Sequence, residues 1–180
     1  MAVLVVTCGS GSGEAAAIEA MDALLPEDRD ARVEITRHEG VLVVRTSLDP
    51  LLARSLLFSS LPRRISKVVP IEQECRPDFG SIADAALAVA QRMSSHSFVV
   101  RCKTRGSLLN SDDLEVTVGQ HLRHRIGLTV NLKSPDFVVY VEVVDDFAGV
   151  AALPFSLPIS MESVREDIVS SMRYISKGGV

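Results

Sequence analysis

The chain has 180 residues, of which 47% are hydrophobic, and its formal net charge is -4. A chain of this length and hydrophobicity can bury a substantial core as one domain or two small ones, so disorder is not expected. No apolar run approaches the roughly 20 residues that cross a bilayer, and the first residues lack the basic segment of a signal peptide. We therefore expect a cytoplasmic protein that has no contact with a membrane.

The three cysteines, Cys8, Cys75 and Cys102, are odd in number, widely spaced and free of any Cys-x-x-Cys pair. They indicate neither a disulfide framework nor a zinc site, and we interpret them as small core residues. His121 and His124 lie three apart on a predicted helix, but no nearby residue completes the four ligands of a structural zinc site. We expect no metal ion and no other cofactor.

The first third of the chain predicts the order strand, helix, strand, strand, helix, strand. Apolar runs and turn residues predict strands over 3–8, 31–37, 41–46 and 67–71, with helices over 14–25 and from Asp49-Pro50 through Leu57. This is the order of a ferredoxin-like βαββαβ domain, which we place at residues 1–78.

The glycine-rich stretch Gly9-Ser10-Gly11-Ser12-Gly13 follows the first predicted strand and could suggest a nucleotide site. The motif is incomplete, however, because the third glycine of G-x-G-x-x-G and the Lys and Ser/Thr of a P-loop are absent. His38-Glu39-Gly40 then joins two strands as a hairpin, whereas a dinucleotide-binding fold requires a helical crossover. We interpret the stretch as a strand-to-helix turn, with Ser12 or Gly13 capping the helix.

A second domain is predicted after the linker-like residues 76–80. The hydrophobic patterns predict a helix over 81–93, strands over 98–106, 129–136, 137–144 and 147–153, and a helix that begins near Asn110 and ends before Gly127. A last helix starts at Ser160 and carries Met161, Val164, Ile168, Met172 and Ile175 on one side. The predicted fold class is α+β, with the second domain at residues 79–153 and a tail with its helix at 154–180.

Positive charge is concentrated in the second domain. Residues 97–133 hold 6 Lys and Arg against 3 Asp and Glu, whereas residues 1–96 hold 10 against 13 and residues 134–180 hold 3 against 7. Strand alternation places Arg101, Lys103 and Arg105 on one face. Since Lys and Arg supply most of the affinity for phosphates, the candidate RNA-binding residues are Arg101, Lys103, Arg105, Arg123, Arg125 and Lys133. Basic side chains on the solvent face of a strand are also ordinary, so a purely structural role stays open.

Four blocks of this region resemble a THUMP domain in their order and approximate spacing. They are Phe98-Val99-Val100-Arg101 through Gly106, Val118-Gly119, Asn131 to Asp136, and Val141-Glu142-Val143. The resemblance implies an RNA-binding module of a tRNA-modifying system, with the acceptor end of tRNA as its partner. It also fits a ferredoxin-like domain before the second domain, since such a domain commonly precedes THUMP domains.

No arrangement of residues predicts catalysis. The serines lack a G-x-S-x-G setting, and no Cys/His pair has a recognisable catalytic context. Catalytic THUMP proteins carry a further methyltransferase or pyrophosphatase-type domain. We expect no such domain here, since 27 residues follow Leu153 in this sequence. The chain most resembles the stand-alone adaptor for tRNA cytidine N4-acetylation. We expect a protein that is not an enzyme and that presents tRNA to a separate modifying enzyme. The resemblance implies a cytidine acetyltransferase as this partner. The alternative is a small-molecule-binding regulatory ferredoxin-like protein.

Overall fold

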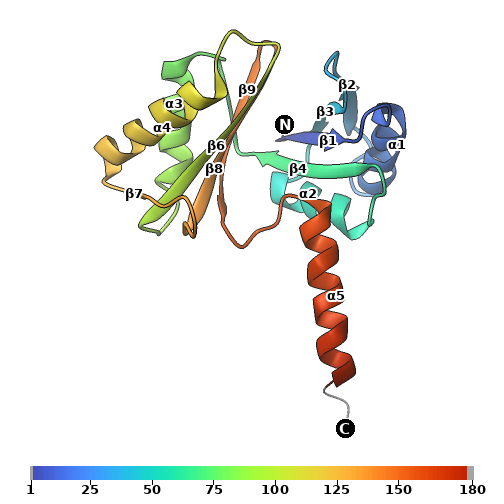
Figure 1. Cartoon of the computed structure of the whole chain (residues 1–180). Helices are drawn as coiled ribbons and strands as arrows, with labels where there is room; N and C mark the ends of the chain where they lie inside the picture. Colours follow the sequence, from blue (N-terminus) through green and yellow to red (C-terminus); the bar gives the residue numbers. More distant parts are fainter. Residues whose placement is uncertain (1, 178–180) are drawn as a thin grey trace. The chain divides into compact units, whose positions relative to one another are not determined.

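The computed structural model describes residues 2–177 (Figure 1). It divides into two compact units, one formed by Met1–Val69 with Pro158–Val180 and the other by Pro70–Leu157. We call them unit 1 and unit 2. Each unit combines a β-sheet with helices, so the chain has a mixed helix and sheet fold. Within the described residues, no helix has both the length and the hydrophobicity needed to cross a membrane.

Unit 1 is built on a four-stranded sheet of order β2-β3-β1-β4, in which β3 runs antiparallel to both of its neighbours. Its elements are β1 (Ala2–Cys8), α1 (Gly13–Leu24), β2 (Arg32–Ile35), β3 (Val41–Thr46), α2 (Pro50–Ser59), β4 (Ile65–Ile71) and α5 (Met161–Lys177). Alternate strand residues such as Leu4 and Leu42 form the core with Ala20 of α1 and Leu57 of α2. This packing follows from the period of two in the strands.

The segment that returns to unit 1 after residue 157 completes that core. The Val68 amide donates to the Ile159 carbonyl oxygen at 2.8 Å. The Arg54 guanidinium donates to the carbonyl oxygen of Pro158. Met161 is 1% exposed and belongs to the same core. Residues from both ends of the chain are therefore needed to build unit 1.

Helix α5 begins at the predicted cap, because the Ser160 hydroxyl oxygen accepts a hydrogen bond from the Ser163 amide at 3.2 Å. Of its predicted apolar side, Val164 and Ile168 are half-buried. The side chains of Met172 and Ile175, which belong to the same prediction, lie outside the described residues.

The glycine-rich stretch forms a strand-to-helix turn. Gly11 has a φ of 69°, and Ser12 takes the N-cap position of α1 without a hydrogen bond from its side chain. Gly40 packs against the end of β1, where a Cβ atom would lie 2.6 Å from the Cys8 carbonyl oxygen. Its φ of 72° also favours glycine, so two independent constraints fix the residue at this hairpin.

Unit 2 is built on a five-stranded sheet of order β5-β9-β8-β6-β7. Its elements are β5 (Gln73–Cys75), α3 (Phe79–Ala90), β6 (Ser97–Arg105), α4 (Ser111–Ile126), β7 (Thr129–Val130), β8 (Phe137–Val144) and β9 (Phe147–Pro154). Strand β6 runs parallel to β7 and β8, whereas β9 runs antiparallel to β8. Helices α3 and α4 lie together on one side of the sheet (Figure 1), and their apolar residues share one core with it.

Two strands of unit 2 differ from the prediction. The strand predicted over 129–136 ends at Val130, because the Asn131 side-chain oxygen accepts hydrogen bonds from the amides of Lys133 and Ser134, both at 3.1 Å, and turns the chain. Strand β5 was not predicted; it has only three residues and pairs with β9 at one edge of the sheet.

The cysteines differ in their burial. Cys102 is buried in the core of unit 2, whereas Cys8 and Cys75 are half-buried. Burial raises the pKa of the Cys75 thiol to about 11 and raises that of Cys102 further. A high pKa keeps a thiol protonated and unreactive, so both groups are in the state expected of structural cysteines.

Candidate nucleic-acid interface

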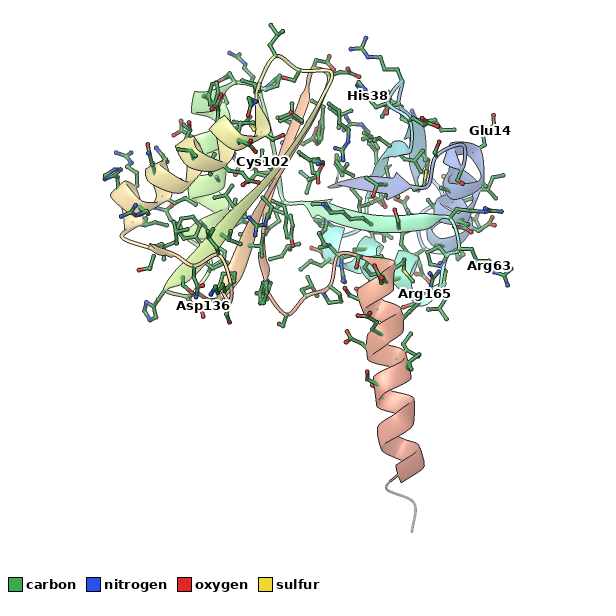
Figure 2. All side chains as sticks on the ribbon, viewed as in Figure 1. Glu14, His38, Arg63, Cys102, Asp136 and Arg165 are labelled. Carbon is green, nitrogen blue, oxygen red and sulfur yellow. The ribbon has the colours of Figure 1, made fainter. Side chains whose placement is uncertain are left out.

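Arg101 and Lys103 project from the face of β6 that lies opposite helices α3 and α4. The other face carries Phe98, Val100 and Cys102, which are buried in the core with the helices, and Figure 2 shows Cys102 on this strand. Arg101 and Lys103 are both exposed. Alternation along the strand therefore divides a core face from a basic face, as predicted.

Tyr140 pairs with Arg101 in the register of β6 and β8. Burial raises the pKa of the Tyr140 phenol, and the positive charge of Arg101 opposes that rise. The side chain of Arg101 remains exposed. It keeps its charge available at the surface of unit 2.

Arg105 lies on the same face, but its guanidinium forms an ion pair inside unit 2. Its Nη1 donates to the Glu142 Oε2 at 2.7 Å, and the two side chains are 17% and 2% exposed. A buried carboxylate requires a charged or hydrogen-bonding partner, which Arg105 supplies. The predicted basic face thus holds two exposed cations and one that forms an internal ion pair.

Arg123 and Arg125 lie exposed in the last turn of α4. The helix begins where predicted, because the Asn110 side-chain oxygen accepts hydrogen bonds from the Asp112 and Asp113 amides at 2.8 and 3.2 Å. It ends at Gly127, whose φ of 69° is the left-handed conformation that glycine favours. Part of the charge of the two arginines offsets the negative end of the helix dipole.

Lys133 lies exposed in the turn after β7. Asp136 holds the far side of this turn: its Oδ2 accepts hydrogen bonds from the amides of His96 and Ser97 and from the Ser97 hydroxyl, at 2.8 to 3.1 Å. These bonds lower the pKa of the Asp136 carboxyl, with the Ser97 amide as the largest cause. Asp136 lies beside the start of β8 (Figure 2), so the turn is fixed at both ends.

A hollow of about 270 Å³ brings some of the predicted residues together. Arg101 and Arg123 both line it, and Lys133 follows another of its lining residues, Leu132, whereas Lys103, Arg105 and Arg125 are not part of it. The complete lining is Phe98, Val99, Val100, Arg101, Glu115, Val116, Gly119, Gln120, Arg123, Val130 and Leu132. The six RNA-binding residues remain predictions.

The apolar part of this hollow was missed in the sequence. Val116 is 58% exposed and Leu132 is 68% exposed. Val116 falls outside the apolar stripe that packs α4, and Leu132 lies beyond the end of β7. In the sequence, the hollow is indicated only by apolar residues that fall outside the pattern of a helix or strand. A single residue of this kind needs no explanation by itself.

The histidines of α4 do not build a metal site with their neighbours. His121 Nε2 lies 3.8 Å from Asp84 Oδ1, which exceeds a hydrogen bond, and His124 is exposed. Among the residues whose placement is described, no group of three His, Cys, Asp or Glu side chains could hold a metal ion.

Residues 76–152 match the THUMP domain family. The chain therefore contains a THUMP domain, which covers most of unit 2 and all of β6 and α4. No curated protein matches the chain.

Solved structures share this fold. PH1313 from Pyrococcus horikoshii Ot3 matches 87% of the chain, with a TM-score of 0.68 and 20% sequence identity. TrmN from Thermus thermophilus matches 89% of the chain, with a TM-score of 0.65 and 21% sequence identity. A 4-thiouridine synthetase, solved as an RNA complex with bound ATP, matches 86% of the chain, with a TM-score of 0.57 and 16% sequence identity. The matches cover 58%, 47% and 42% of those proteins, so the chain spans about half their length.

Proposed function

We propose that this chain is a tRNA-binding protein that has no catalytic activity of its own and presents tRNA to a separate modification enzyme. The observation that carries the proposal is the THUMP match over residues 76–152, which includes the exposed Arg101 and Lys103 of β6. A THUMP domain implies RNA binding in tRNA modification. The net charge of -4 does not oppose this function, because binding depends on where the cations lie.

Unit 1 supports the proposal through its architecture. We propose that it is a ferredoxin-like domain, since its elements follow the order βαββαβ and its sheet the order β2-β3-β1-β4. A ferredoxin-like domain followed by a THUMP domain is the arrangement of the adaptor for tRNA cytidine N4-acetylation. A cytidine acetyltransferase is accordingly the enzyme that we propose as the partner.

We propose that the protein recognises the acceptor end of tRNA by its shape and backbone. The deep, narrow major groove of A-form RNA prevents side chains from reading bases inside the duplex. Only 4% of the residues are aromatic and none is Trp, so few platforms are available for stacking bases. A tRNA that lacks its single-stranded 3′ end should bind more weakly than the intact tRNA; equal affinity would exclude this mode of recognition.

Binding is tested by replacing Arg101 and Lys103 with Ala and measuring tRNA affinity between 50 and 200 mM salt, a range over which phosphate contacts change affinity strongly. Each lost phosphate contact should reduce the salt slope by about one. Arg92→Ala is the matched control, since this exposed arginine of unit 2 lies 3.8 Å from Glu72, precedes β6 and does not line the hollow beside Arg101. The site assignment is wrong if the double variant keeps the affinity and the slope of the unmodified protein.

The absence of catalysis is tested with tRNA, ATP and an acetyl donor, with and without a cytidine acetyltransferase. A linked pair of binding modules can raise the concentration of tRNA at the active site of a partner without donating a catalytic residue. Mass spectrometry of the nucleosides should show modification only when the enzyme is present, and more of it when this protein is added. A modified nucleoside formed by the protein alone would identify it as an enzyme, and no stimulation would exclude this enzyme as its partner.

A further inference from the structure

The outer edge of β6 is covered by another strand only at its beginning. Strand β8 pairs with β6 from Phe98 to Arg105, but β7 pairs with it only at Ser97 and Phe98. The Asn131 amide donates to the Phe98 carbonyl oxygen at 2.8 Å, which shows that the backbone groups of Phe98 face this outer edge. Beyond Phe98, the backbone groups of every second residue therefore face an edge without a partner strand.

Side chains of α4 cap part of this edge. The Cys102 amide donates to Glu115 Oε1 at 2.8 Å, and the Thr104 amide donates to the Ser111 hydroxyl oxygen at 3.1 Å. The alternation places the amide and carbonyl of Val100 on the same edge. In the part of the chain that the structure describes, no side chain caps the Val100 amide. The edge thus offers one donor and one acceptor at Val100.

The 270 Å³ hollow described above opens at this uncapped position, because Val100 is one of its lining residues. The exposed Val116 and Leu132 supply apolar surface, and Arg101 and Arg123 supply positive charge. Arg101 Nη1 lies 3.5 Å from the Val100 carbonyl oxygen, a long contact that leaves the acceptor available. Pockets for drug-sized molecules are typically about 300–1,000 Å³, so this hollow suits a smaller group.

We propose that the hollow takes one unstacked base of single-stranded RNA, whose edge bonds to the Val100 backbone while the adjoining phosphates meet Arg101 and Arg123. The inference rests on the proposed function and names the part of the RNA that enters the site. A base suits one donor and one acceptor between apolar walls, and this mode of binding needs no aromatic platform. A partner β-strand would need a longer free edge, but the Cys102 and Thr104 amides are already capped.

Gly119 gives a way to close the hollow. It lines the hollow from α4, and a Cβ atom added there would lie 4.0 Å from Val100 Cγ2, an ordinary contact. Gly119→Ala should therefore fold normally and leave most of the space free, whereas Gly119→Leu should fill it. Val116→Phe closes the hollow from its rim at a residue that is 58% exposed, so it tests the same idea without disturbing the core.

The probe is a hairpin RNA with a four-nucleotide single-stranded 3′ tail, together with four versions that each lack one tail base. The unmodified protein and Gly119→Ala should lose about tenfold in affinity at one tail position, as expected when two hydrogen bonds to one base are lost. Gly119→Leu and Val116→Phe should bind the complete hairpin about tenfold more weakly and show no further loss at that position. All four proteins should keep the same salt slope, because no phosphate contact is removed.

Two results would overturn the inference while leaving the proposed function intact. One is that no missing base weakens the binding of the unmodified protein. The other is that Val116→Phe, or a folded Gly119→Leu, binds every hairpin as tightly as Gly119→Ala does. A different result, that the unmodified protein binds neither the hairpin nor tRNA at any salt concentration, would reject the proposed function itself.

Discussion

Arg105 and Arg101 lie on the same face of one strand but serve different purposes. The guanidinium of Arg105 neutralises the Glu142 carboxylate inside unit 2 at 2.7 Å, whereas Arg101 is exposed beside Tyr140. Period-two alternation identifies the face of each residue but not the partner of its side chain. That partner lies 37 residues away on β8 and becomes visible only with the parallel register.

We predict that Arg105→Ala lowers the free energy of unfolding by about 3 kcal/mol, because it removes one member of a buried ion pair. Its effect on the salt slope of tRNA binding should be negligible. Arg101→Ala, in contrast, should reduce the salt slope of tRNA binding and change the free energy of unfolding little. Urea titrations and salt-dependent binding of both variants check the prediction, and it is wrong if the two variants shift the slope equally.

Asp28 makes the stability of unit 1 depend on pH. Its carboxylate accepts hydrogen bonds from the Thr46 hydroxyl at 2.5 Å, the Ser47 amide at 2.6 Å and the Asp30 amide at 3.1 Å. The Thr46 bond is the largest cause of the lowered pKa of Asp28. Since the folded pKa lies below the unfolded one, the unfolded chain binds more protons between the two values, and stability rises with pH there.

The contribution of Asp28 should therefore be complete above the ordinary aspartate pKa of about 4 and should be lost as the pH falls through the lower folded value. Asp28→Asn should be less stable than the unmodified protein at pH 7, and the difference should shrink below pH 4, where the wild-type carboxyl is protonated too. Denaturant midpoints of both proteins between pH 2.5 and pH 7 measure this, and a constant difference would contradict the assigned cause.

At the scale of elements, local chemistry predicted most helix ends and long strands. Asn110 and Gly127 bound α4 as expected because a side-chain cap and a left-handed glycine act within a few residues. Strand β8 has the predicted bounds, since an uninterrupted apolar run shows where it begins and ends.

The elements that were missed depend on contacts between distant residues. Strand β5 exists only because its three residues pair with β9, more than 70 positions later. The hollow at β6 was also beyond prediction, because it requires β7 to stop at Val130 and Glu115 to reach back to Cys102. Periodicity describes the neighbours of a residue on its own element, and these features lie between elements.

At the scale of the whole molecule, unit 2 is inserted into the chain of unit 1. The chain leaves unit 1 after Val69 and returns at Pro158. Val68 and Ile159, on either side of the insertion, are joined by a hydrogen bond of 2.8 Å. Closing a loop costs entropy that grows with the logarithm of its length, so an insertion of this size is tolerated when its ends meet.

This insertion sets an order of events during synthesis. The ribosome makes the first 69 residues early, yet the core of unit 1 lacks Met161 until all of unit 2 has been translated. Unit 2 is continuous in sequence and can fold as soon as it emerges. A nascent chain stopped after Leu157 should consequently show slow amide exchange in β6, β8 and α4 but fast exchange in β1 and β3. The first 69 residues to be made would thus belong to the unit that matures last.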